Sequence, residues 1–220
     1  LLRYPHLRGL PVVIGGRRSS PEPQSGDPLA LPRLRNYAGR GVITTATYAA
    51  RQFGIGSAMG LMKAAALCPQ AILLPVDFEQ YRHYSRVFKH IVREIAPVVE
   101  DRGVDEIYID FTDVPGGQRE GGRVLARLIQ KCIADATGLT CSVGVAPNKL
   151  LAKMASEFNK PNGISVVYET DLEKMIWPLP CRKINGIGPK ASERLHTLGL
   201  DTIGQLAAAD PAFLQRHFGT

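Results

Sequence analysis

The chain has 220 residues, of which 45% are hydrophobic and 21% are charged. This length is enough for one large or two small domains, and the composition excludes an intrinsically disordered chain because it can supply a core. No apolar run approaches the roughly 18 residues that a transmembrane helix needs, so we expect no membrane partner. The sequence starts at Leu1 rather than Met and shows no signal peptide, so we expect its natural N-terminus to lie upstream.

The net charge and the cysteines indicate the kind of partner and the cellular compartment. A formal net charge of +7 and a pI near 9.4 fit a polyanion partner, although many basic enzymes bind no nucleic acid. The four cysteines form no CxxC pair, and no histidine lies at zinc-finger spacing. We therefore expect reduced thiols in a cytosolic protein.

Hydrophobic periodicity predicts strands that alternate with helices. In chain order, the expected elements are a strand (9–16), an irregular insertion rich in Pro, Ser and Arg (17–40), a strand (41–48), two short helices (49–54 and 57–69), a strand (71–76), a long amphipathic helix (77–97), a hairpin that turns at Arg102-Gly103, a helix (121–138), a strand (139–146), a helix (148–160), a strand (164–168) and a helical remainder (169–220). The apolar stripe of the long helix consists of Phe78, Tyr81, Phe88, Ile91, Val92 and Ile95. This order predicts an α+β fold with a mixed sheet and helices on one face, followed by a small all-helical unit.

Two neighbouring carboxylates, Asp105 and Glu106, stand where the expected hairpin turn meets its second strand. Side chains alternate between the faces of a strand, so both carboxylates can reach one ion only near a strand end, where the backbone bends. Mg²⁺ is usually held by one or two carboxylates together with substrate phosphates, and two such ions can stabilise both oxygens of a phosphoryl transfer. A solvated turn would carry the same residues, so the pair alone leaves both interpretations open.

The stretch GVITTATYAARQFGIGSAMG, residues 41–60, gathers hydroxyl groups next to a guanidinium. The hydroxyls belong to Thr44, Thr45, Thr47 and Tyr48, one turn before Arg51. Neutral donors and a permanently charged planar fork suit a triphosphate. Threonines that serve strand propensity, followed by an ordinary helix, would give the same pattern.

The stretch SVGVAPNKLLAKMASEFNKPNG, residues 142–163, runs from a strand through a proline turn into a helix. The expected buried face consists of Leu150, Leu151, Met154 and Phe158, and the lysines off this face are Lys149, Lys153 and Lys160. Lysines in such positions are usually solvated, so the helix alone does not indicate a site.

The stretch INGIGPKASERLHTLGLDTIGQL, residues 184–206, joins two expected helices by a GIG turn, with Pro189 in the first turn of the second helix. Glycines let the backbone approach a phosphate, and a helix N-terminus presents free N–H groups. This pattern resembles a helix–hairpin–helix motif, which grips the nucleic-acid backbone without reading its sequence. A purely structural helical hairpin is the alternative.

Taken together, these stretches and GVDEIYIDFTDV (103–114) resemble the Y-family DNA polymerases of the DinB type. The resemblance runs over nearly the whole chain apart from residues 17–40. It implies a small fingers domain at 1–76, a palm at 77–167 with a mixed sheet and helices on one face, and an all-helical thumb at 168–220 with a helix–hairpin–helix.

The resemblance also assigns roles to individual residues. It implies that Asp105 and Glu106 are the catalytic ligands of two Mg²⁺ ions. It implies that the nucleotide is contacted by Thr45, Tyr48, Arg51 and Lys160, and that the DNA backbone is contacted by Gly186, Gly188 and Lys190.

The implied activity is the addition of dNTPs to a primer 3′-hydroxyl, with low fidelity, during translesion synthesis in DNA damage tolerance and repair. The implied partners are primer–template DNA, a dNTP and a sliding clamp. The resemblance further implies a monomer in the bacterial cytoplasm.

The chain departs from the family pattern in three places. The family's first strand carries a further metal-ligating Asp and an aromatic steric gate. Neither is found in this sequence, which we expect to begin just after them. The C-terminal little-finger domain and any clamp-binding tail are also missing, and residues 17–40 are longer than the usual link. We therefore expect that the chain is a fragment with little polymerase activity of its own.

Two other functions fit parts of the sequence. A catalytically inactive polymerase relative could act as a DNA-bound adaptor, although retained Asp105 and Glu106 argue against it. A structure-specific DNA-binding module that uses only the hairpin at 184–206 would leave the earlier motifs without a role. Only the polymerase requires dNTP binding that depends on Mg²⁺, whereas all three functions predict salt-sensitive DNA affinity.

Overall fold

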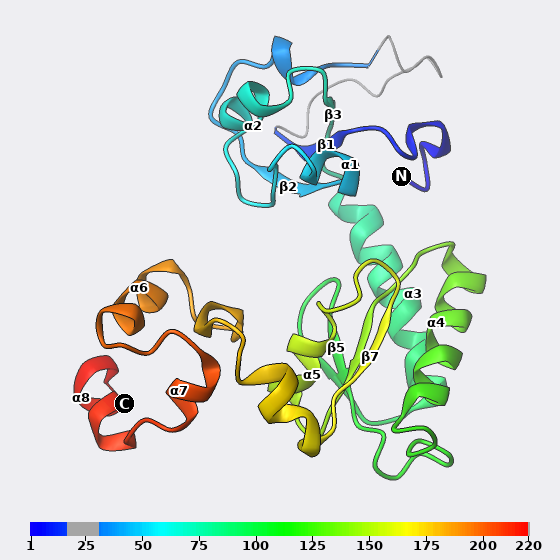
Figure 1. Ribbon diagram of the computed structural model, residues 1–220. Helices are drawn as coiled ribbons and strands as arrows, with labels where there is room; N and C mark the ends of the chain where they lie inside the picture. Colours follow the sequence, from blue (N-terminus) through cyan, green and yellow to red (C-terminus); the bar gives the residue numbers. More distant parts are fainter. Residues whose placement is uncertain (17–30, 220) are drawn as a thin grey trace. The chain divides into compact units, whose positions relative to one another are not determined.

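A computed structural model describes residues 1–16 and 31–219, so residues 17–30 of the expected insertion lie outside the described residues. Contacts between residues divide the chain into two compact units, Leu1–His83 and Tyr84–Thr220. Each unit combines strands with helices (Figure 1), so the α+β class expected from the sequence is confirmed.

Unit 1 is built around a three-stranded mixed sheet. Its elements are η1 (Pro5–Leu7), β1 (Val12–Gly15), η3 (Leu34–Asn36), β2 (Ile43–Ala46), α1 (Tyr48–Arg51), α2 (Leu61–Leu67), β3 (Ile72–Leu74) and the start of α3 (Phe78–Ile95). The central strand β1 runs antiparallel to β2 and parallel to β3. Because side chains alternate along a strand, Val13 packs into one buried cluster with Ile43, and Val12 packs into another with Leu7.

The described end of the expected insertion, residues 31–40, is tied to this unit. Leu31 and Leu34 are buried in its two apolar clusters. The hydroxyl of Tyr37 accepts a hydrogen bond of 2.9 Å from the amide of Gly41. Apart from η3 the backbone here is irregular, but its side chains contribute to the core.

Unit 2 contains the rest of the chain. Its elements after α3 are β4 (Val99–Asp101), β5 (Ile107–Ile109), α4 (Arg123–Thr137), β6 (Val143–Val145), α5 (Lys149–Ala155), β7 (Ile164–Val166), η4 (Glu169–Asp171), η5 (Leu172–Ile176), η6 (Cys181–Lys183), α6 (Pro189–Thr197), α7 (Ile203–Ala207) and α8 (Pro211–Phe218). Its described strands form two two-stranded sheets, an antiparallel β4–β5 and a parallel β6–β7, instead of one continuous layer. Each of these strands has three residues, so each sheet is small.

Helices α3 and α4 cover the β4–β5 hairpin. Val92 of α3 and Ile129 of α4 are buried in one apolar cluster. Ile107 and Ile109 of β5 pack against this cluster. The two helices lie side by side (Figure 1), and Gly138 ends α4 in the left-handed conformation, with φ of 67°. The hairpin therefore rests with one face on a helical layer.

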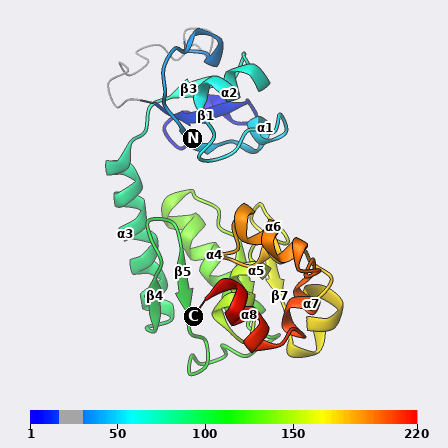
Figure 2. The same ribbon diagram turned by 90° about the vertical axis from the view of Figure 1, so that its left-hand side faces the viewer.

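The C-terminal helices form a separate group within unit 2. Figure 2 shows α6, α7 and α8, coloured orange to red, gathered at the end of the chain. A small core joins this group to α5, because Met154 and Ala155 of α5 pack with Ile176 of η5 and Ile203 of α7. Among the described residues, no helix is both long enough and apolar enough to span a membrane.

Candidate active site

The two neighbouring carboxylates lie in the turn of the β4–β5 hairpin. In the antiparallel ladder Val99 faces Ile109 and Asp101 faces Ile107. The chain leaves the ladder after Asp101, and the amide of Arg102 donates a 3.1 Å hydrogen bond to the carbonyl of Glu106. Asp105 and Glu106 are both exposed. The expected position of the pair, at a strand end where the backbone bends, is confirmed.

The second strand of the hairpin separates an apolar face from a polar face. Ile107, Ile109 and Phe111 all belong to the cluster under α3 and α4. The ring of Tyr108 lies on the other face, 5.9 Å from the guanidinium of Arg102 and 6.0 Å from the ammonium of Lys149. Burial of the apolar face thus fixes the register that places Glu106 beside the polar face.

Helix α5 supplies two lysines to the same hairpin. Lys153 forms an ion pair with Glu106. Lys149 lies 2.7 Å from the carboxylate of Glu100 on β4, and this hydrogen bond lowers the pKa of Glu100. These lysines lie off the buried face of α5, as expected, but each has a carboxylate partner. They connect α5 to the turn that carries the pair.

The expected buried face of α5 is only half right. Leu151 and Met154 pack into the core next to η5 and α7. Leu150 and Phe158 are exposed, at 45% and 37%. Phe158 is exposed because α5 ends at Ala155, so Phe158 lies beyond the helix. Leu150 is exposed because the helices after β7 cover the side of α5 that carries Met154 and Ala155.

The chemistry of the pair suits a hard divalent cation. Mg²⁺ prefers oxygen ligands and is commonly held by one or two carboxylates, with water and substrate phosphates completing the shell. Asp105 and Glu106 supply such oxygens on an exposed turn, where phosphates can reach them. Within residues 1–16 and 31–219, no group of three His, Cys, Asp or Glu side chains could hold a metal. A pair of carboxylates fits an ion whose remaining ligands come from water and a substrate.

In unit 1, the hydroxyl of Thr47 is occupied by the backbone. It accepts hydrogen bonds from Val12 at 3.0 Å and from Ala50 at 3.3 Å, and it donates to the carbonyl of Leu10 at 3.0 Å. These bonds cap α1 and tie it to β1. Among the hydroxyls grouped from the sequence, that of Thr47 has a structural role.

Tyr48 and Arg51 form a pair on α1. The guanidinium of Arg51 lies 5.3 Å from the centroid of the Tyr48 ring, and its Nε donates to the carbonyl of Ala46 at 3.1 Å. Tyr48 is 51% exposed. Thr45 precedes them on β2, opposite Ile14 of β1, and is partly exposed. One short segment thus carries all three residues.

The other expected phosphate and DNA contacts lie in unit 2. Lys160 follows α5 and pairs with Glu157 at 2.6 Å. Gly186 has φ of 99°, which favours glycine, while Gly188 caps α6 with φ of −80°. Lys190 is exposed in the first turn of α6. The helix expected before the GIG turn is the single 3₁₀ turn η6.

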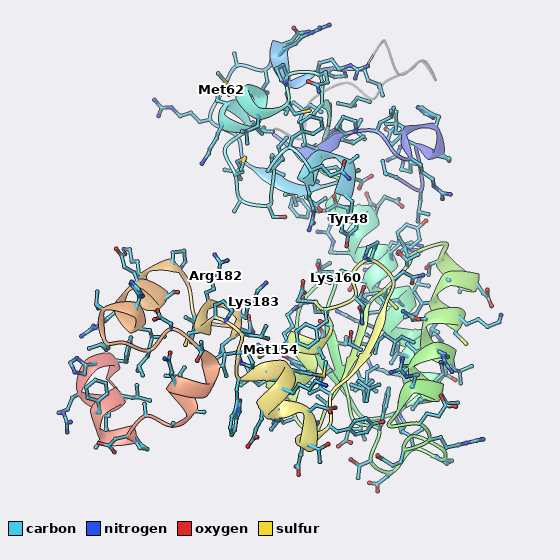
Figure 3. The ribbon with its side chains drawn as sticks, viewed as in Figure 1. Tyr48, Met62, Met154, Lys160, Arg182 and Lys183 are labelled. Carbon is cyan, nitrogen blue, oxygen red and sulfur yellow. The ribbon has the colours of Figure 1, made fainter. Side chains whose placement is uncertain are left out.

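A pocket of about 290 Å³ connects this turn with α5. Its walls include Lys153 and Met154 of α5 and Arg182 and Lys183 of η6, and it continues to Gly186. Figure 3 labels Met154, Arg182 and Lys183 at this junction. Lys153 therefore contacts Glu106 of the carboxylate pair and also lines a basic pocket.

Sequence reasoning missed one charged residue near the turn. Lys89 of α3 is 8% exposed and donates to both carboxylate oxygens of Asp101 at 2.9 Å. Its spacing from the buried Ser85, Val92 and Ala96 is that of a helix face, which is a signal that could have revealed it.

Known proteins share these sequence features. Residues 1–157 match the impB/mucB/samB family, and residues 169–200 match the IMS family HHH motif. The chain belongs to the impB/mucB/samB family. The chain is similar to the DNA polymerase IV of Streptococcus pyogenes serotype M2 (strain MGAS10270), to which it is 40% identical over 98% of its length.

Solved structures of similar proteins show the same fold. The crystal structure of DinB from Sulfolobus solfataricus matches 100% of the chain with a TM-score of 0.82 and 30% identity, and the chain covers 59% of it. An insertion ternary complex of Dbh DNA polymerase matches 100% of the chain with a TM-score of 0.83 and 30% identity, over 59% of its own length. The resemblance to DinB-type Y-family polymerases is thereby confirmed. The chain spans 54% of the length of the Streptococcus relative.

Proposed function

We propose that the chain is the polymerase portion of a translesion DNA polymerase, which adds dNTPs to a primer 3′-hydroxyl. The observation that carries the proposal is the exposed Asp105–Glu106 pair in a chain of the impB/mucB/samB family. The pair lies on a hairpin turn that is closed by the hydrogen bond from the amide of Arg102 to the carbonyl of Glu106. An adaptor without catalysis would not need these two carboxylates.

In this proposal, Asp105 and Glu106 hold two Mg²⁺ ions, as the family resemblance implies. When bound, the metal supplies Lewis-acid stabilisation of the charge that develops on the transferred phosphoryl group. Lys153 balances the charge of Glu106 and orients its carboxylate toward the polar face of the hairpin.

Thr45, Tyr48, Arg51 and Lys160 bind the triphosphate of the incoming nucleotide. Arg51 uses Nε for the carbonyl of Ala46, which fixes the guanidinium and leaves its terminal N–H groups for phosphate oxygens. Lys160 contributes a further positive charge. An arginine that is fixed before binding loses less conformational entropy when it forms these bonds.

Gly186, Gly188 and Lys190 contact the DNA backbone. Gly186 and Gly188 have no heavy atom within 4 Å of the place where a Cβ would stand, so a phosphate can approach the bare backbone there. The IMS family HHH motif match supports this role. We assign residues 1–76 to the fingers, 77–167 to the palm and 168–220 to the thumb.

Primer–template DNA and a dNTP are the proposed substrates, and a similar structure was solved as an insertion ternary complex of a DNA polymerase. The bacterial relative supports a location in the bacterial cytoplasm, where chromosomal DNA is found. Binding to a sliding clamp and a monomeric state are proposed from the family resemblance alone.

Metal-dependent primer extension tests the proposal. The natural protein that contains these residues is compared with Asp105→Asn, Glu106→Gln and a control, Asp110→Asn. The carboxylate of Asp110 accepts a 2.9 Å hydrogen bond from the amide of Thr112, a local turn that the asparagine side chain can retain. Loss of a metal ligand removes several kcal/mol of transition-state stabilisation, so either site variant should extend primers at least about a hundredfold more slowly.

Two results would contradict the proposal. Either the unmodified protein extends no primer although it binds DNA, which favours the adaptor, or both site variants retain the rate of the Asp110 control. Thermal unfolding of every variant shows whether a lost rate reflects a lost fold.

A further inference from the structure

Lys89 is an unusual residue for the interior of unit 2. It lies in the middle of α3 and is only 8% exposed. A buried ammonium is costly unless its hydrogen bonds are satisfied, so lysines are seldom buried without a specific partner. The position of Lys89 therefore calls for a structural reason.

The end of β4 and the hairpin turn provide the hydrogen-bond partners of Lys89. Its Nζ donates to Oδ1 and Oδ2 of Asp101 at 2.9 Å each, and to the carbonyl of Gly103 at 2.5 Å. An ammonium group has three N–H donors, and these contacts engage them. The Lys89 hydrogen bond lowers the pKa of Asp101.

Asp101 extends this contact into the turn. Its Oδ1 also accepts a 3.0 Å hydrogen bond from the amide of Gly103, where φ is 126°. The amide of Arg102 closes the turn onto the carbonyl of Glu106. Lys89 thus contacts the carbonyl of Gly103 directly and its amide through Asp101, two residues before Asp105.

We propose that Lys89 is a positioning residue, which sets the turn geometry so that Asp105 and Glu106 present their oxygens to the proposed metal ions. The inference rests on the proposed metal-binding role of this pair. It goes beyond that role because it places a determinant of metal affinity on α3, in the layer beneath the hairpin.

A simple anchor for the hairpin would also use Lys89, but the two roles differ in what they affect. An anchor contributes to the stability of the fold and leaves the metal affinity of the folded protein unchanged. A positioning residue affects the metal affinity itself, because groups that orient metal ligands typically change it by 10- to 100-fold.

The experiment measures Mn²⁺ binding by the folded natural protein, by electron paramagnetic resonance of free Mn²⁺. The variant Lys89→Met keeps the length and apolar stem of the side chain and removes its three donors. Lys131→Met is the matched control, since Lys131 also forms a carboxylate ion pair, with Asp135, but on the exposed surface of α4. Asp105→Asn reports on the proposed site itself.

We expect Lys89→Met to weaken Mn²⁺ binding about tenfold or more, Lys131→Met to leave it unchanged and Asp105→Asn to abolish it. If Lys89→Met is folded and binds Mn²⁺ like the unmodified protein while Asp105→Asn does not, the inference is overturned and the proposed function stands. If Asp105→Asn also binds Mn²⁺ normally, both are overturned.

A second variant covers the case in which Lys89→Met does not fold. Asp101→Asn alters the partner that is largely exposed, at 52% of its side chain, and can keep the bond to the amide of Gly103. We expect the same loss of Mn²⁺ affinity, because the ion pair with Lys89 is lost. Unchanged affinity in folded Asp101→Asn would overturn the inference.

Discussion

Gly144 of β6 allows α5 to lie close enough to deliver its lysines to the hairpin. A Cβ added at this position would lie less than 3.0 Å from three backbone atoms, namely the carbonyl oxygen of Ala152, the carbonyl carbon of Ala155 and the amide nitrogen of Ser156. Because none of them belongs to a side chain, no change of rotamer relieves the overlap. Gly144→Ala must therefore move the end of α5 away from the strand.

The cost of this movement follows from the nature of the overlap. Forcing one extra methyl group into a packed core typically costs 1–3 kcal/mol, and contacts with three backbone atoms place this variant at or above the upper end. We expect Gly144→Ala to lower the free energy of unfolding by about 3 kcal/mol or more, and the melting temperature by about 6–12 °C.

The assay is urea denaturation of the natural protein, followed by circular dichroism. Gly188→Ala is the control, because a Cβ there has no heavy atom within 4 Å and φ of −80° suits alanine. Its cost should stay below about 1 kcal/mol. If Gly144→Ala costs less than 1 kcal/mol with an unchanged denaturant slope, the close approach of α5 is dispensable and our account of how Lys149 and Lys153 are placed is wrong.

Two further predictions concern single side chains. Arg51→Ala should raise the KM for dNTP in single-nucleotide insertion about tenfold or more, since charge-assisted hydrogen bonds contribute about 1.5–3 kcal/mol. The melting temperature should change little because Arg51 is exposed. An unchanged KM would remove Arg51 from the nucleotide site. The hydrogen bond from His196 to Asp201, at 2.5 Å, raises the pKa of His196. The stabilisation of the folded state by this bond is therefore complete below pH 6.5 and is lost as the pH rises through the higher folded-state pKa. The melting temperature of the unmodified protein should therefore fall relative to that of Asp201→Asn between pH 6 and pH 8.5, and parallel profiles would contradict this.

The hairpin could be predicted from the sequence because its signals are local. β-Branched and aromatic residues flank Arg102-Gly103, and alternation assigns Ile107 and Ile109 to one face and Tyr108 to the other. The structure confirms this alternation. The position of the carboxylate pair at the strand end follows from the same local pattern, which is why it could be located without a structure.

The exposed face of α5 could not be predicted in the same way. Leu150 and Phe158 are apolar, but the residues that decide which side of α5 is covered are Ile176 and Ile203, far along the chain. Periodicity within a helix of seven residues does not reveal such distant partners. The hydroxyl of Thr47 shows a related difficulty, because a residue that caps a helix and one that binds phosphate look alike in sequence.

The lysines around the hairpin connect the fold to its proposed chemistry. Lys89 reaches the turn from α3, while Lys149 and Lys153 reach it from α5. They pair with Asp101, Glu100 and Glu106, respectively.

Among the four acidic residues from Glu100 to Glu106, all within the described part of the chain, Asp105 is the one to which the structure gives no ion pair. An unpaired carboxylate between paired neighbours is held in place by their contacts and keeps its own oxygens available. If Asp105 is a metal ligand, as we propose, the surrounding lysines neutralise its acidic neighbours, and Asp105 contributes the unshared charge that would attract a divalent ion.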